Sequence, residues 1–210
     1  MNRKTCLAAA VALALCGGAY AQTTGSEVQR NVDQQQRIEQ GLQAGQLSAG
    51  EAARLEGGQA KIDRMQQNAL KDGALSPGEK ARIQNAQNAQ SRAIYDDRHN
   101  AVAGDPASAS SQRMQADVRR NVNQQARIEQ GVSTGALTKK ETAKLEGGQA
   151  RVAHKEAVAG ADGHVGAGEQ ARVQHSENVQ SARVYNKKHN AKVRAGAALQ
   201  NAPGPANMAA

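Results

Sequence analysis

A shift of 90 residues aligns the chain with itself, and this internal repeat is the strongest constraint on its fold. Between residues 28–101 and 118–191, 36 of the 74 aligned positions are identical, and the alignment needs no gap. Residues 37–41, for example, recur unchanged as residues 127–131. Self-similarity at a fixed period indicates that one supersecondary unit is used twice.

The segments inside each repeat have the periodicity of helices. Apolar or small residues follow each other in steps of three and four in a heptad-like, coiled-coil stripe, which consists of Leu55, Gly58, Ile62, Met65 and Ala69. We predict helices near 27–43, 49–69 and 77–99, with counterparts 90 residues later, and no strand. Most other positions are Gln, Arg, Glu or Ala, which are mainly good helix formers, and we assign them to the polar faces.

The predicted fold is therefore all-α, a tandem duplication of a roughly three-helix unit. Its predicted parts are a signal peptide (1–21), a first helical repeat (22–103), a short Pro/Ser-rich linker (104–112), a second repeat (113–194) and a disordered tail (195–210). Ser111 is the expected cap of the helix after the linker. The sequence has no Trp and no Phe, so each repeat should be marginal alone, and partial disorder stays open as an alternative.

The N-terminus has the pattern of a cleavable signal peptide. Residues 1–4 are basic, residues 7–16 are apolar but shorter than the about 20 residues needed to span a bilayer, and 19–21 read Ala-Tyr-Ala. Cleavage would leave Gln22 as the first residue of a periplasmic or secreted protein without a transmembrane segment. An uncleaved anchor is the alternative.

Both cysteines, Cys6 and Cys16, lie within this signal. The mature protein would have no thiol, which excludes disulfides, thiolate zinc sites and cysteine nucleophiles.

Each repeat contains two turns with the pattern Gly-x-Leu-Ser/Thr-x-x-Glu or a variant of it. The hydroxyl residue and the glutamate fit the capping box that begins a helix, as in Ser48 with Glu51, Ser76 with Glu79 and Thr138 with Glu141. The fourth turn has Gly166 instead of a hydroxyl residue. The turn glycines suit the left-handed residue that ends a helix; they are Gly45, Gly73, Gly135 and Gly163.

The same pattern resembles the second half of an EF-hand loop. That resemblance implies a calcium site on residues 68–79, with oxygen ligands from Asn68, Asp72, Ser76 and Glu79. Calcium takes about six to eight oxygens, and Leu70 occupies a ligand position without offering one. Capping explains more copies of the turn, so calcium binding is the alternative interpretation. The chain as a whole resembles uncharacterised exported bacterial helical-repeat proteins with degenerate EF-hand-like units, a resemblance that implies no activity.

Charge is distributed unevenly along the chain. Residues 22–111 carry 10 Lys/Arg and 11 Asp/Glu, net −1, whereas residues 112–210 carry 15 and 8, net +7. Basic pairs stand at 119–120, 139–140 and 187–188. Such a surface suits an anionic envelope component such as a lipid head group or a polysaccharide. Nucleic acid is disfavoured because the chain has almost no aromatic residues to stack on bases.

Two further sequence features are a histidine near two acidic residues and a glycine pair in each repeat. His164 beside Asp162 and Glu169 has the ligand types of a weak transition-metal site, although surface histidines are the simpler interpretation. The glycine pairs 57–58 and 147–148 fall in mid-helix, where we expect a kink or a close helix crossing.

No local motif of an enzyme is present, neither a nucleophile with its base nor a phosphate loop. We therefore expect no enzymatic activity and no cofactor. The expected function is that of a non-catalytic binding or structural protein of the bacterial cell envelope, with an unknown protein or an anionic envelope component as partner. The oligomeric state stays open.

Overall fold

The structure is a computed structural model of the chain, and it describes the backbone of residues 16–190 and the side chains from Thr24 to Asn190. The described residues form helices and no strand, which confirms the predicted all-α class. The helices are α1 (Cys16–Gln43), α2 (Ala49–Ala69), α3 (Pro77–Arg98), α4 (Ala109–Ser133), α5 (Lys139–Ala159) and α6 (Ala167–Lys188).

Most helix bounds agree with the sequence analysis, with two exceptions. α1 begins at Cys16, so the predicted signal cleavage point after residue 21 lies inside a helix. α4 begins at Ala109, inside the predicted linker, and Ser108 caps it by accepting a hydrogen bond from the Ser111 N–H at 3.2 Å. The prediction of Ser111 as the cap was wrong. Residues 1–15 of the predicted signal and the predicted tail 195–210 lie outside the described residues.

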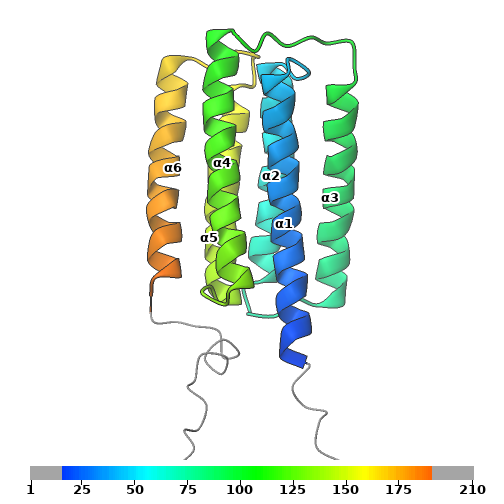
Figure 1. The fold of residues 1–210 in the computed structure, drawn as a ribbon, viewed down its shortest axis with the longest axis vertical. Helices are drawn as coiled ribbons and strands as arrows, with labels where there is room; N and C mark the ends of the chain where they lie inside the picture. The colour runs from blue at the N-terminus through cyan, green and yellow to red at the C-terminus, as the bar shows by residue number, and fades with distance from the viewer. Residues whose placement is uncertain (1–15, 191–210) are drawn as a thin grey trace, which may run out of the picture.

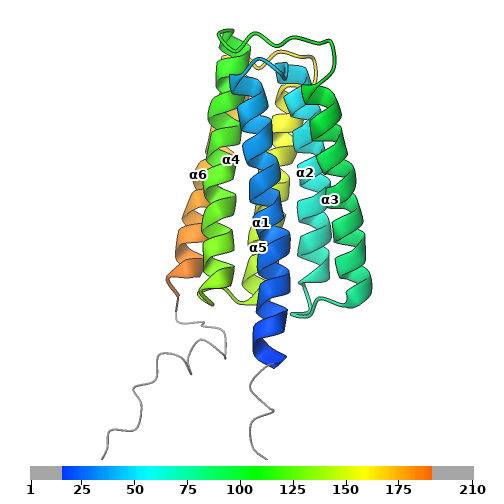
Figure 2. The ribbon, with the colours of Figure 1, turned by 45° about the vertical axis from the view of Figure 1, so that its right-hand side comes forward.

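The six helices run side by side in one bundle (Figures 1 and 2). α1 packs against α4 and α2 against α5, while α3 flanks α1 and α2, and α6 flanks α4 and α5. The chain reverses direction at each connection, so that α1 is antiparallel to α4 and α2 to α5 (Figure 1). We refer to α1–α3 as the N-terminal set and to α4–α6 as the C-terminal set.

Apolar side chains form two clusters in this bundle. One cluster includes Leu47 of the α1–α2 turn, and the other includes Leu137 of the α4–α5 turn. These two turns lie at opposite ends of the bundle (Figure 1). Each cluster mixes both sets, since Met114 joins the first and Val28 joins the second. The two predicted repeats therefore share their core.

Many other buried side chains are polar, and glutamine is the most frequent of them. On α2 the buried polar residues are Glu56, Gln59, Asp63 and Gln66. Assigning the glutamines to the polar faces was therefore wrong at these positions. Of the predicted α2 stripe, Leu55, Ile62 and Ala69 are buried, whereas Gly58 and Met65 are only half-buried.

The mid-helix glycines allow α3 and α6 to approach their neighbours closely. Gln90 of α3 donates to the Leu55 carbonyl at 2.9 Å, and Gln180 of α6 donates to the Leu145 carbonyl at 2.9 Å. A Cβ atom on Gly58 or on the equivalent Gly148 would overlap the amide of that glutamine. The structure thus uses these glycines for a close helix crossing.

Candidate functional site

The four turns begin their helices as the capping interpretation predicts. Ser48, Ser76 and Thr138 each accept a hydrogen bond from the N–H of a glutamate three residues later, and that glutamate accepts from the cap N–H. Gly166 has no side chain to offer, and only its N–H donates to Glu169, at 2.8 Å. All four turn glycines have positive φ angles, so the left-handed conformation is confirmed at each of them.

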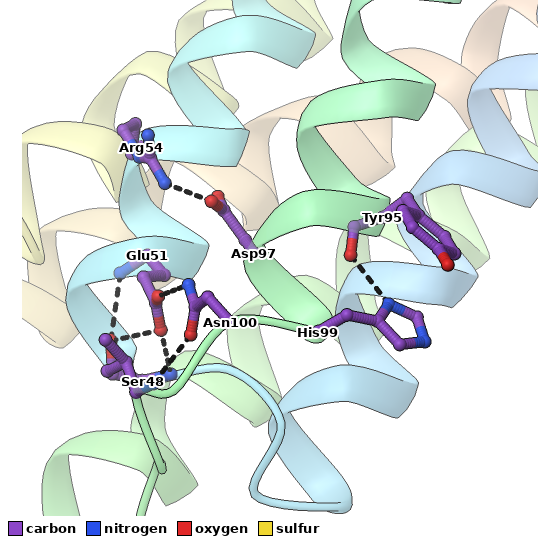
Figure 3. Close-up of polar contacts among 8 residues, drawn as sticks. Ser48, Glu51, Arg54, Tyr95, Asp97, His99 and Asn100 are labelled. Atoms are coloured by element: carbon purple, nitrogen blue, oxygen red, sulfur yellow. Dashed lines mark hydrogen bonds and ion pairs between the residues drawn. The ribbon is translucent and has the colours of Figure 1, made fainter.

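In the first turn the capping glutamate also ties the end of α3 to the start of α2. Glu51 Oε2 accepts from the N–H and the hydroxyl of Ser48, while its Oε1 accepts from Asn100 Nδ2 at 2.7 Å (Figure 3). Asn190 makes the equivalent bond to Glu141 at 2.6 Å. Although burial acts to raise the pKa of Glu51, the bonds from Ser48 and Asn100 together lower it. These glutamates therefore act as helix caps and clamps between helices.

Of the residues predicted as calcium ligands, the structure brings Ser76 and Glu79 together. Ser76 donates to Glu79 Oε2 from its hydroxyl at 2.6 Å and from its N–H at 3.0 Å. These bonds lower the pKa of Glu79. Asp72 accepts from the Ala74 N–H at 2.8 Å, and Asn68 lies exposed in the last turn of α2. The predicted site is thus built as a capping box, and calcium binding there stays a prediction.

The second predicted metal group also has local partners. The His164 N–H donates to Asp162 Oδ1 at 2.9 Å, and Glu169 Oε2 caps α6 at Gly166. Among the side chains that the structure describes, no three His, Cys, Asp or Glu residues lie together as a metal-binding group.

A polar layer between the two apolar clusters contains the most perturbed groups of the protein. Gln35 of α1 donates to Glu56 of α2 at 2.8 Å, and the equivalent Gln125 of α4 donates to Glu146 of α5 at 3.1 Å. Burial raises the pKa of both glutamates to about 7. The side chains around these amides fill the space between them and leave no water-sized cavity there.

Two further carboxyl groups extend this layer toward α6. Glu156 contacts Glu56 across the α2–α5 interface, and its pKa rises well above the usual range, first through burial and then through neighbouring carboxyl groups. Burial and the charge of Asp117 raise the pKa of Glu177 to about 8. The N-terminal set has Gln66 and Gln87 at the positions equivalent to Glu156 and Glu177. At these two positions the C-terminal set thus has buried carboxyl groups where the N-terminal set has amides.

The surface feature that best fits a ligand is a groove between α5 and α6 with a volume of about 520 Å³. Its lining is mainly aliphatic and includes Val158 and Ala159 of α5, and Ala171 and Val173 of α6. Val158 is 61 % exposed, one of few large apolar side chains of the described residues that face solvent. A concave, mostly apolar site of this size is typical of small-molecule binding.

Cations surround this aliphatic lining. Lys155 and Arg172 line the groove together with His154 and His175. An adjoining hollow shares Lys155 and adds Arg151 and Arg183. Within the described part of the chain, no ion pair involves any of these lysine or arginine residues. The groove therefore combines an apolar lining with a positive rim.

The basic pairs noted in the sequence contribute elsewhere. Arg119 pairs with Glu39 at 2.7 Å, Arg120 with Glu177 at 3.4 Å, and Lys187 with Glu141 at 3.9 Å. These contacts join helices to each other, so Arg119, Arg120 and Lys187 contribute to packing. The lysine and arginine residues of the groove and the adjoining hollow are four residues apart on α5 and eleven apart on α6. Only the packing of α5 on α6 reveals them as a group.

The comparisons with known proteins add no family. No family model, no curated protein and no solved structure matches the sequence. Among the described helices, none is long and apolar enough to cross a bilayer.

Proposed function

We propose that the protein is a non-catalytic, exported binding protein of the bacterial cell envelope, and that it binds its ligand in the α5–α6 groove. The observation that carries this proposal is the aliphatic lining of the groove, in which Val158 and Ala171 are exposed beside Lys155 and Arg172. These two cations have no acidic partner among the described residues. A concave site lined by aliphatic side chains, with a few polar groups at its edge, is typical of ligand binding.

A non-catalytic role is supported by the position of the titratable groups. Groups with strongly shifted pKa values are candidates for acid–base catalysis when they lie in a cleft. Here Glu56 and Glu146 lie in a layer that is enclosed and filled by amide side chains. We assign these carboxyl groups to the specificity of helix packing.

A tandem duplication of a three-helix unit is part of the same proposal. In addition to the sequence repeat, the bounds of α5 and α6 equal those of α2 and α3 plus 90 residues. The duplicated units would pack antiparallel on each other, with the groove developed in the C-terminal one.

The experiment measures binding of anilinonaphthalene sulfonate, an anionic apolar dye, to residues 22–210. We expect saturable fluorescence enhancement that Val158→Asp reduces by about tenfold in affinity, because the new charge stands in the apolar lining and repels the sulfonate. Asn68→Asp, at the equivalent position of α2, is the matched control and should leave binding unchanged. Equal dye binding by all three proteins would refute the α5–α6 groove as the binding site.

Calcium binding at residues 68–79 is the second candidate. In its favour, Asp72 and Glu79 are close enough for the charge of Asp72 to act on Glu79, and the turn is largely exposed. Far-UV circular dichroism in chelator and then in millimolar calcium tests it. We expect the same helix content in both conditions; a calcium-dependent gain that Asp72→Ala abolishes would establish the second candidate instead.

A further inference from the structure

We infer that the ligand of the α5–α6 groove is a single-chain fatty carboxylate, whose alkyl chain lies on the aliphatic lining and whose head group is bound by Lys155 and Arg172. This inference rests on the proposed function and names its ligand class.

The lining selects for an alkyl chain. Its apolar side chains are valines and alanines, of which Val158 and Ala171 are exposed, and no Phe, Tyr or Trp lines the groove. A planar aromatic ligand would gain most from stacking on one of these large aromatic side chains, which are missing from this lining. A flexible alkyl chain requires only aliphatic contact, and each buried methylene adds to the affinity.

The rim selects for an anionic head group. Lys155 and Arg172 stand on facing helices, and His154 and His175 line the same groove. The acid that lines it, Glu169, accepts a hydrogen bond from the Gly166 N–H at the start of α6. Charge-assisted hydrogen bonds from ammonium and guanidinium groups to a carboxylate are among the stronger polar contacts.

The protein's own terminal segments do not match this charge. Residues 1–21 contain Arg3 and Lys4 and no acid, and residues 191–210 contain Lys192 and Arg194 and no acid. Both segments would bring positive charge to a positive rim. Charge complementarity therefore favours an external, anionic occupant.

The sequence repeat indicates that part of this chemistry, Lys155 and Val158 but not Arg172, is particular to the C-terminal set. Lys155 and Val158 are Met65 and Asn68 in the N-terminal set. The C-terminal set thus has a lysine and an exposed valine at the two positions where the N-terminal set has a methionine and an asparagine. These differences provide test substitutions whose replacement residue already occurs at the equivalent position.

The test is titration calorimetry of residues 22–210 with octanoate, decanoate and dodecanoate, each below its micelle concentration. Affinity should rise by up to about fourfold per methylene, the factor expected when each group leaves water. Dodecyltrimethylammonium, with the same chain and a cationic head, should bind at least about tenfold more weakly than dodecanoate. An acidic amphipathic peptide is titrated in parallel.

Two variants locate the ligand. Lys155→Met should weaken dodecanoate binding by about tenfold, whereas Lys71→Met, an exposed lysine of the α2–α3 turn, should not change it. Val158→Asp should weaken dodecanoate binding too. Circular dichroism of each variant confirms that the helices are intact, and Asn68→Asp controls for a new charge on an exposed helix position.

The outcomes separate this inference from the proposed function. Dye binding in the groove without fatty-acid binding, or with equal affinity for the cationic chain, overturns the ligand class and leaves the binding role intact. Tighter binding of the acidic peptide overturns it in favour of a protein partner. Absence of both dye and fatty-acid binding refutes the proposed function itself.

Discussion

Replacing Glu177 with glutamine should remove a large part of the pH dependence of stability. The Glu177 carboxyl is fully buried, and among the described residues neither of its oxygens accepts a hydrogen bond. Its pKa is about 8 in the folded protein, against an ordinary value of 4.5. Each pKa unit corresponds to about 1.4 kcal/mol, so this group alone lowers the free energy of unfolding by about 4 kcal/mol between pH 4 and pH 8.

The sign follows from the raised pKa. Below about pH 4.5 the carboxyl is protonated in both states, and stability is at its full value. As pH rises through 8, the unfolded chain has already released the proton, so that stability is lost. Glutamine does not ionise, and it is the residue at the equivalent position 87 of the N-terminal set. Allowing about 1 kcal/mol for the lost contact with the half-exposed Arg120, Glu177→Gln should be about 3 kcal/mol more stable than the native sequence at pH 8.

The assay is urea unfolding, monitored by circular dichroism at pH 5, 6, 7 and 8 and at constant ionic strength. A constant m-value across these conditions checks that unfolding remains two-state. Glu79→Gln is the control, because the pKa of that capping carboxylate is lowered from 4.5. Its contribution to stability is lost only as pH falls below about 4.5, so this variant should lose as much stability as the native protein between pH 5 and pH 8. If the native protein and Glu177→Gln lose stability equally between pH 5 and pH 8, the buried carboxyl does not titrate as argued.

Two pairs of substitutions test the capping boxes and the close helix crossings by thermal or urea unfolding. Ser48→Ala should lower the free energy of unfolding by about 1 kcal/mol, because the Glu51 N–H loses its hydrogen-bond partner. Gly166→Ser should raise the free energy of unfolding by a few tenths of a kcal/mol, because it completes the fourth capping box. No change in either variant would contradict the capping role. Gly148→Ala should lower the free energy of unfolding by about 1–3 kcal/mol, because the new methyl group displaces the Gln180 amide. Gly168 has open space around it, so Gly168→Ala should stabilise the protein. Equal effects at both glycines would argue against the close helix crossing.

The helices and their starting points could be predicted from sequence because the signals are local. The capping pairs and turn glycines fix where α2, α3 and α5 begin, and a single repeated pattern supports each assignment. The start of α4 was harder to predict, because Ser108 and Ser111 both have a hydroxyl that could cap a helix and only the geometry of the turn distinguishes them.

The core and the groove could not be predicted because they depend on how helices far apart in sequence pack. Glutamine and glutamate are usually exposed, and their burial at Gln35 and Glu56 depends on α1 lying against α4 and on α2 lying against α5. Lys155 and Arg172 look like ordinary surface charges until α6 packs on α5. One signal was available: the buried polar positions 56 and 146 are identical in the two repeats, although a repeat of a charged residue also fits a solvent-facing role.

Two helix sets of similar sequence in one chain can differ from each other at any position, whereas the two subunits of a symmetric dimer cannot. In a dimer of identical subunits, every substitution appears twice, and a groove gained on one side is gained on the other. Here α5 carries Lys155 and Val158, while α2 keeps Met65 and Asn68. The C-terminal set can thus specialise while the N-terminal set continues to supply half of the shared core, and the expected stoichiometry is one ligand per polypeptide.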